Sequence, residues 1–317
     1  MKHRLPILPA ILLGMAGAVA VGIFLARHRH HAPTVSPPEP TTVRASGIAP
    51  SNRENLVPAP RAGEIIAHAA RQLASHETVS AKINLHSEVF GESLTAVGQY
   101  LQGPAESRRV RLELKLKLGE KVCSLQQVSD GNALWSRQNT LAQTRLGRVD
   151  LQRVLAAMQQ SGFRAGVDVL AIGGLPMLLD SLNRSFEFQS MRSERLGVIP
   201  TYVVLGVWKP AALAQLMADE QKPPGSEPSA EPLPVPEYLP NQIEIFVGRD
   251  DLFPYQVDYL RASNPGTHHN SDRLLAKMKF VDVHFDTSID PAQFVHPASD
   301  GVPIDDTEAF LKRVLPR

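Results

Sequence analysis

Clustered histidines are the first residues of this chain whose types could support metal chemistry. His28, His30 and His31 could offer imidazole ligands, but they stand among arginines directly after a long apolar run. A solvated basic flank beside a membrane segment explains them better than a metal site does. His268-His269 lacks the i, i+4 spacing of a helical zinc pair, so we expect it on a loop surface. The histidines therefore predict no metal centre.

The acidic pairs and the single cysteine indicate no stronger site. Asp250-Asp251 and Asp305-Asp306 lack the ligand spacing of an EF-hand loop, so we predict a turn and a helix cap. Cys123 lies in an apolar strand pattern, which predicts a buried, inert thiol. The sequence contains no nucleophile elbow, zinc-protease, phosphate-loop or dinucleotide motif. We therefore expect neither enzyme activity nor a cofactor.

The clearest structural signal is residues 107–119, where apolar and charged side chains alternate. The apolar set is Val110, Leu112, Leu114, Leu116 and Leu118. Strict period-two alternation predicts an antiparallel strand with one apolar and one wet face. Asp130-Gly131, between two further apolar runs, predicts a hairpin. The centre of the protein is therefore expected to be a sheet with one apolar side, and function depends on what covers that side.

Seven apolar residues are the candidates for ligand contact if that side is hollow. They are Leu112, Leu114, Leu116, Leu125 and Trp135, with Trp208 and Phe246 as weaker candidates. The alternative for the same residues is an ordinary closed core, which is what apolar stripes more often form.

The N-terminal 31 residues predict a membrane anchor with basic flanks. Residues 5–26 are apolar or small throughout, and a membrane-spanning helix needs about 20 such residues. A cleaved signal peptide with Ala18-Val19-Ala20 as its cleavage site is the alternative. The apolar run continues past that site, which favours the anchor. A proline-rich linker, residues 32–60, follows; the net charge of +1 argues against a nucleic-acid partner.

Residues 61–317 predict one α+β domain. We expect a first helix over residues 63–75, a strand meander, a helix capped by Asp150, and further strands. The apolar phase shifts between Phe280 and Val281, which predicts a bulge. Residues 220–240 are rich in proline and mark either a domain boundary or, as we prefer, a surface insertion. The predicted fold is a curved, mostly antiparallel, incomplete β-barrel of roughly eight strands covered by helices.

The order of these elements and the end of the chain resemble a known family. The residues that carry the resemblance are Ser129-Asp130-Gly131 before Leu134-Trp135, then Val281-Asp282-Val283-His284-Phe285-Asp286, Ile289-Asp290-Pro291-Ala292-Gln293-Phe294, Pro297 and Gly301-Val302. Together they resemble the LolA-like proteins, which include LolA, LolB and RseB-type sensor domains.

The resemblance implies a function as well as a fold. It implies an incomplete barrel whose concave apolar face, lidded by helices, holds the acyl chains of a lipid or lipoprotein. Each buried methylene contributes about 0.8 kcal/mol, so such a site needs no catalytic group. With the anchor, the chain would be a single-pass protein of the inner membrane whose domain faces the periplasm. The alternative is an anchored sensor or interaction module without lipid cargo, which would engage a protein partner through the proline-rich segments.

Overall fold

The computed structural model describes residues 60–89, 92–118, 121–140, 143–161, 167–220, 236–268, 272–297 and 301–315. The predicted anchor with His28, His30 and His31, nearly all of the linker, most of the proline-rich run 220–240, and His269 lie outside these residues. Among the residues described, no helix is both long and apolar enough to cross a membrane.

The described part of the chain forms twelve strands and five α-helices. The first half contains α2 (Pro60–Ser75), β1 (Val79–Val89), β2 (Glu92–Gln102), β3 (Arg109–Leu118), β4 (Lys121–Asp130), β5 (Ala133–Asn139), β6 (Thr144–Asp150), α3 (Leu151–Ser161) and α4 (Leu170–Ser185). The second half contains β7 (Phe186–Leu196), β8 (Ile199–Trp208), α5 (Pro210–Glu220), β9 (Gln242–Gly248), β10 (Pro254–Arg261), β11 (Arg273–Phe285), β12 (Ile304–Asp305) and α6 (Thr307–Val314).

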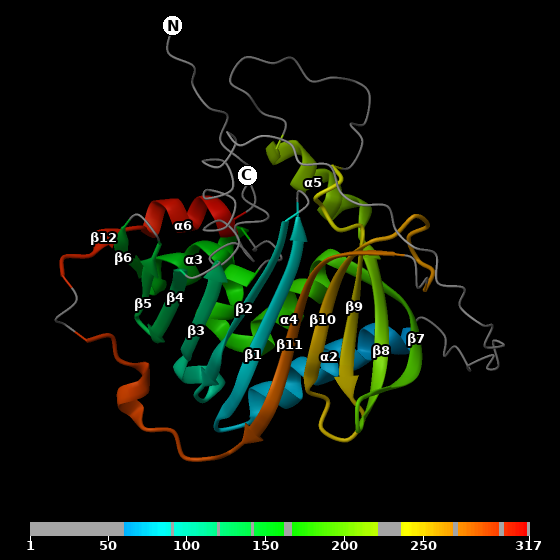
Figure 1. The fold of residues 1–317 in the computed structure, drawn as a ribbon, viewed down its shortest axis with the longest axis horizontal. Coiled ribbons are helices and arrows are strands. Elements are labelled where there is room, and N and C mark those ends of the chain that lie inside the picture. The colour runs from blue at the N-terminus through cyan, green and yellow to red at the C-terminus, as the bar shows by residue number, and fades with distance from the viewer. Residues whose placement is uncertain are drawn as a thin grey trace, which may run out of the picture.

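All the strands belong to one unclosed sheet in the order β12-β6-β5-β4-β3-β2-β1-β11-β10-β9-β8-β7. Every pairing is antiparallel except that of β12 with β6, which is parallel. Strands β1 and β11 meet in the middle of the sheet and join its two halves (Figure 1). Strands β8 and β9 pair directly, so the segment between them leaves and re-enters the same sheet.

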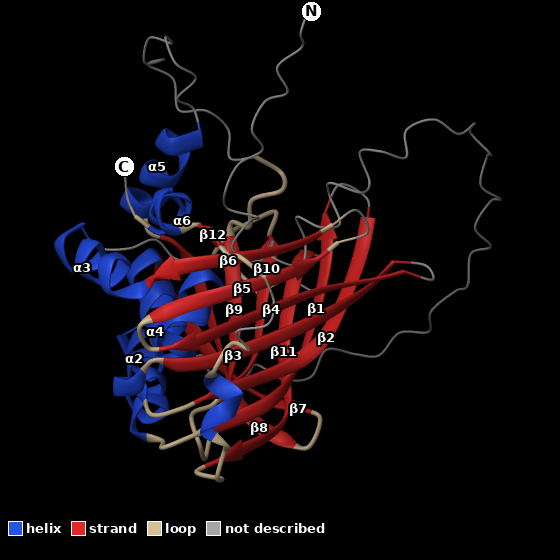
Figure 2. Ribbon diagram, turned by 90° about the vertical axis from the view of Figure 1, so that its left-hand side faces the viewer, coloured by secondary structure: helices blue, strands red, loops and turns tan. Residues whose placement is uncertain are grey.

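The helices α2, α3 and α4 lie together on one side of the sheet (Figure 2). We call the side that α2 and α4 cover the inner face, and the opposite side the outer face. Helix α2 turns Ile66, Ala69 and Leu73 toward the inner face, and each of these side chains is at most 1% exposed. These three residues recur at spacings of three and four within the predicted helix, which places them on one face.

The sheet has more strands than the roughly eight expected. Strand β6 escaped prediction because Gly147 and charged residues interrupt its alternation, and β12 has two residues, too few to show any period. Two local predictions are confirmed. The Asp150 carboxylate accepts the Arg153 amide at 3.2 Å, as an N-cap does. Strand β11 has the expected bulge, although the β1–β11 register shifts between Val281 and His284, beside Asp282 with its positive φ of 52°, and not between Phe280 and Val281.

A C-terminal strap, residues 286–297, crosses the outer face over β3 and β4. Its short 3₁₀ turn, Pro291–Phe294, buries Phe294 to 4% exposure. The Arg111 guanidinium on β3 donates to the Gln293 carbonyl at 2.8 Å. The chain therefore covers part of its own outer face before β12 and α6 complete the sheet edge at β6.

Candidate functional site

The inner face of β3 and β4 is the surface that the alternating leucines build. Leu112, Leu114, Leu116 and Leu125 are 2–5% exposed and belong to one apolar core with α2 and α4. Leu114 stands directly opposite Leu125 in the β3–β4 ladder. The structure thus brings four of the seven predicted ligand-contact residues together.

The other three predicted residues lie elsewhere. Trp208 is on the inner face of β8, next to the edge strand β7. Its ring centroid lies 4.2 Å from that of Phe186, and its indole donates to the Pro240 carbonyl at 2.7 Å. Trp135 is on the outer face, stacked on His296 of the strap with the ring centroids 4.9 Å apart. Phe246 is 6% exposed, also on the outer face.

Strand parity explains why Trp135 and Phe246 face outward. Leu134 is 1% exposed within the inner core, so its neighbour Trp135 must point the other way. In β9 every side chain is buried, and Ile245 and Val247 occupy the inner face on either side of Phe246. When both faces of a strand are buried, composition cannot reveal which residues share a face.

Helix α4 is the part of the helical cover that lies against β3, β4 and β7. It is broken at Gly174, whose φ of 69° and ψ of −166° are not helical. Pro176 then stands in the first turn of the second half, a position that suits proline because the first turn needs no amide donor. A break of this kind divides the cover into two segments.

Buried hydrogen bonds, which we call the Tyr100–Gln102 pin, hold the break in α4 to β2. The Leu175 amide donates to the Tyr100 hydroxyl at 2.9 Å and to Gln102 Oε1 at 3.1 Å, and Tyr100 itself donates to Gln102 Oε1 at 2.5 Å. Burial raises the pKa of Tyr100, and the hydrogen bond from Leu175 only partly opposes that shift. A Cβ at Gly174 would lie 2.3 Å from Gln102 Oε1, so the pin requires glycine at the break.

The inner face is closed in this conformation. A side chain that borders a space wide enough for an acyl chain presents much of its surface to that space, whereas these leucines are at most 5% exposed. They are covered by the protein itself, α4 included. An acyl chain would enter here only if α4 moved away from β3 and β4.

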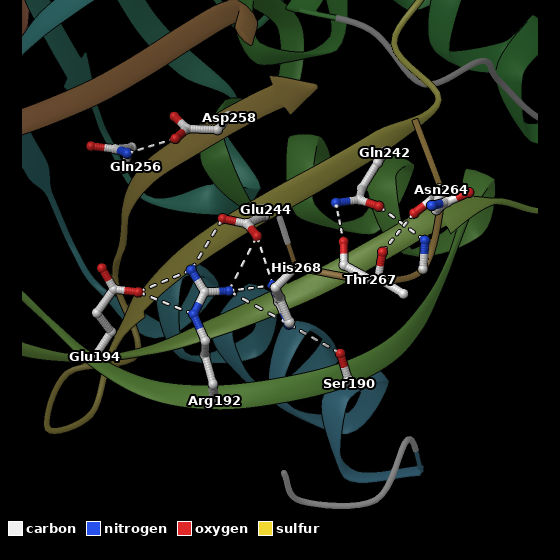
Figure 3. A network of polar contacts seen from close by, with 11 residues as sticks. Ser190, Arg192, Glu194, Gln242, Glu244, Gln256, Asp258, Asn264, Thr267 and His268 are labelled. Atoms are coloured by element: carbon white, nitrogen blue, oxygen red, sulfur yellow. Dashed lines mark hydrogen bonds and ion pairs between the residues drawn. The ribbon is translucent and has the colours of Figure 1, made fainter. Parts of the chain in front are cut away.

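A second cluster lies on the outer face, where side chains of β7, β9 and the loop after β10 meet (Figure 3). Arg192 Nη1 and Nη2 donate to the two carboxylate oxygens of Glu244 at 3.1 and 3.3 Å, and Arg192 also pairs with Glu194. His268 Nδ1 lies 2.7 Å from Glu244 Oε1, and its Nε2 lies 3.2 Å from Ser190 Oγ. We call Ser190, Arg192, Glu244 and His268 the outer polar cluster.

The charge state of this region follows from its burial. Burial opposes ionisation of Glu244, but hydrogen bonds from His268 and Arg192 outweigh it and lower the pKa of that carboxyl. Burial raises the pKa of the neighbouring Asp258 to about 6, although Lys277 lies 3.6 Å away and opposes the shift. Glu244 is therefore an ionised, oriented carboxylate, whereas Asp258 takes up a proton readily.

Sequence reasoning missed the outer polar cluster. His268 lies on a loop, as predicted, but the structure packs it against Ser190 and Glu244, so the prediction that it is a surface residue without partners is wrong. One signal was present: Glu244 stands between Ile243 and Ile245 in a wholly apolar strand, where a charge needs a partner. The partners could not be named, because they come from segments far apart in the chain.

The remaining candidates have structural roles. Asp251 accepts the Phe253 amide at 3.0 Å, and Asp305 accepts the Thr307 amide at 2.9 Å, as predicted for a turn and a helix start. Cys123 is 1% exposed, as predicted. Within the described ranges, no three His, Cys, Asp or Glu side chains are grouped closely enough to hold a metal ion.

Comparisons with known proteins yield structural likenesses alone. No family model and no curated protein sequence matches the chain. An outer membrane lipoprotein-sorting protein domain from Vibrio parahaemolyticus is 11% identical, with 80% of this chain and 99% of that chain covered and a TM-score of 0.33.

Two further solved structures cover this chain to a similar extent. The lipoprotein LppX from Mycobacterium tuberculosis is 9% identical, with 73% and 98% of the two chains covered and a TM-score of 0.37. A LolA superfamily protein from Nitrosomonas europaea is 10% identical, with 76% and 98% covered and a TM-score of 0.29. Scores of this size do not assign the chain to a family.

Proposed function

We propose that the chain is an envelope protein of LolA-like type that binds the acyl chains of a lipid or lipoprotein on the inner face. The observation that carries the proposal is the unclosed sheet whose apolar inner face lies under a helix broken at Gly174. Release of α4 from β3 and β4 would expose the four leucines as a continuous apolar surface. Burial of an acyl chain there would gain about 0.8 kcal/mol per methylene.

The rest of the chain fits an anchored form of such a protein. We propose that residues 5–26 hold it in the inner membrane as a single pass, and that the domain faces the periplasm. The linker would keep the domain away from the bilayer surface. An anchored binder receives or presents its ligand at the membrane instead of carrying it across the compartment.

A fatty acid that carries a photoactivatable diazirine tests the inner face directly. We expect the purified full chain to form adducts within β3, β4 and α4, read by peptide mass spectrometry. The variant Leu125→Ala opens apolar space on the inner face, and such space binds apolar ligands. It should lower the dissociation constant about threefold.

Val128→Ala is the matched control for this experiment. Val128 is on the same strand and is also buried, at 1% exposure against 5% for Leu125, but it lies on the outer face. It should leave fatty-acid binding unchanged. If neither the unmodified chain nor Leu125→Ala takes up or cross-links the fatty acid, the acyl-binding proposal is wrong.

A second candidate function, an anchored sensor or interaction module without cargo, is favoured by the closed inner face. Leucines that the protein itself covers need no ligand to satisfy them. In that case deletion of residues 221–235 would abolish capture of a protein partner, and lipid would be absent from chain purified from cells. Native mass spectrometry of the purified chain separates the two functions, because only the first predicts co-purified lipid.

A further inference from the structure

The outer polar cluster contains a serine, a histidine and a glutamate in linear contact. Ser190 Oγ lies 3.2 Å from His268 Nε2, and His268 Nδ1 lies 2.7 Å from Glu244 Oε1 (Figure 3). A hydroxyl within hydrogen-bond reach of a base, with the base oriented by a third group, is the arrangement that activates a nucleophile. Such arrangements are recognised by geometry, not by sequence position.

The sheet places Ser190 and Glu244 on one face. A register shift between Phe188 and Ser190 adds Gln189 to β7, and Ser190 then stands opposite Leu205. Leu205 in turn stands opposite Glu244 of β9. The two residues therefore share one cross-strand row, and the bulge sets the direction of the Ser190 side chain. Bulges are often found beside active sites, where they aim a side chain.

The loop after β10 places His268 over this row by contacts that do not involve the histidine. The Gly266 amide donates to Gln242 Oε1 at 2.9 Å, and Gln242 Nε2 donates to the Thr267 carbonyl at 3.2 Å. Gly266 has a positive φ of 94°, and a Cβ there would lie 2.5 Å from Gln189 Oε1. The imidazole is thus carried by a loop fixed to β9 and closely packed against the bulge.

The hydrogen-bond donors and acceptors around His268 favour a base facing Ser190. Arg192 Nη1 also contacts Nδ1, and this contact is not a hydrogen bond when Nδ1 is protonated, because both nitrogens then only donate. The N–H groups of the guanidinium have their acceptors in the Glu244 and Glu194 carboxylates. A carboxylate only accepts, so the short contact to Glu244 is satisfied when Nδ1 carries the proton. The lone pair of Nε2 then points toward the Ser190 hydroxyl, as general-base catalysis requires.

We propose that Ser190, His268 and Glu244 form a nucleophile–base–acid triad that hydrolyses small carboxylic esters on the outer face. Ser190 Oγ bonds to the ester carbonyl carbon while its proton passes to His268 Nε2. The bond to the alkoxy group breaks, and that group leaves as an alcohol with the proton from His268. Water, deprotonated by His268, then cleaves the acyl-serine ester, which releases the carboxylic acid and restores the Ser190 hydroxyl.

The surroundings of Ser190 restrict the substrate class. Arg192 Nη1 lies 3.5 Å from His268 Nε2, and the pairing of Arg192 with Glu244 and Glu194 offsets the positive charge that this guanidinium brings beside the imidazole. Arg192 and His268, which lie beside Ser190, are polar and partly exposed, which suits short acyl groups better than long ones. The site is on the opposite side of the sheet from the proposed acyl-binding face and is independent of it.

A fluorophosphonate probe and p-nitrophenyl acetate test the triad in the full chain. We expect a single phosphonate adduct at Ser190, found by peptide mass spectrometry, and ester hydrolysis with a burst of p-nitrophenol. Ser190→Ala should abolish the adduct and lower the hydrolysis rate at least about 100-fold, as loss of a triad member does. His268→Gln should do the same, because the base would then be absent.

Ser193→Ala on the same strand is the matched control, because Ser193 is exposed and stands outside the cluster. It should leave adduct formation and hydrolysis unchanged. Thermal melting of each variant checks that it is folded, and the Ser190→Ala change is small enough to preserve the sheet. If Ser190 takes no adduct in the folded chain, or if hydrolysis persists in Ser190→Ala, the triad proposal is overturned.

Discussion

Asp258 is a carboxyl group that the fold keeps 7% exposed on the outer face of β10. Its Oδ2 accepts from Gln256 Nε2 at 2.9 Å, and Oδ1 has no hydrogen-bond partner within the described part of the chain. Burial raises its pKa to about 6, above the value near 3.9 expected in an unfolded chain. The folded state therefore binds this proton more tightly than the unfolded state does.

Asp258→Asn should stabilise the protein in a pH-dependent manner. The contribution of a raised pKa is fully present below about pH 4 and is lost as pH rises through about 6. The variant should therefore gain about 2 kcal/mol over the unmodified chain at pH 7.5, and this gain should disappear at pH 4. Urea unfolding at both pH values measures the difference.

Glu187→Gln, an exposed change on β7, is the control for Asp258→Asn and should show no such trend. A constant difference between Asp258→Asn and the unmodified chain from pH 4 to 7.5 would contradict the assignment of this proton to Asp258.

At the scale of single residues, the sequence predicted which side chains are buried better than it predicted the face of the sheet on which they lie. The alternation in β3 located four inner leucines because charged residues mark the other face of that strand. Trp135 and Phe246 follow apolar neighbours, so the sequence does not show from which face of the strand their side chains project. Contacts such as that of His268 with Glu244 depend on loop placement, which no local pattern encodes.

Helix α4 and its pin to β2 form the element whose integrity the proposed acyl-binding function needs. Gly174→Ala combines a strained positive φ with a Cβ 2.3 Å from Gln102 Oε1 and 2.9 Å from the Tyr100 hydroxyl. We expect a loss of about 3 kcal/mol in the free energy of unfolding, measured by urea titration. Fatty-acid binding should also change, because the pin fixes α4 over the inner face.

Gly197 offers a matched control for this substitution. It has nearly the same φ, 66°, at the β7–β8 turn, but nothing lies within 4 Å of a Cβ built there. Gly197→Ala should therefore cost only the backbone strain, about 1 kcal/mol. Equal losses for the two variants would show that the Tyr100–Gln102 pin does not hold α4.

At the scale of elements, prediction succeeded where one segment carries its own signal. The helix predicted after Asp150 is present as α3, and its apolar residues at helical spacing, Leu151, Val154, Leu155 and Met158, are buried. In the sequence, the break at Gly174 is visible only as Gly-Gly-Leu-Pro, because the residues that hold it, Tyr100 and Gln102, are on strand β2. The expected number of strands was too low because short or glycine-interrupted strands have no clear period.

At the scale of the whole molecule, the sheet ends at β7 on one side and at β6 with its two-residue partner β12 on the other. Asp306, directly after β12, pairs with the Arg145 guanidinium of β6, and Phe310 and Val314 of α6 are at most 2% exposed. Arg313 of α6 lies 3.5 Å from Asp168, whose carboxyl is buried. These contacts make the C-terminal residues a cover for one end of the sheet.

Deletion of residues 304–317 should uncover the β6 edge and the apolar surface beneath α6. Exposed strand edges pair with other chains, so the truncated protein should form larger species than the full chain at equal concentration. Analytical ultracentrifugation measures this, and thermal melting should show a lower midpoint. Asp306→Asn, which weakens one ion pair but keeps β12 and α6, should show neither effect to the same degree.

An unchanged size distribution of the truncated chain would show that β12 and α6 do not protect the sheet edge.

Strand β1 has consequences for how the protein is made. Its central partner is β11, and the Thr78 hydroxyl donates to the Thr287 carbonyl although the two residues are 209 positions apart. During biosynthesis, the nascent chain must therefore keep one side of β1 unpaired until residues 273–285 have been synthesised. Strands that pair over such a sequence distance form slowly and leave aggregation-prone intermediates. The nascent protein should consequently depend on chaperones until its last strands arrive.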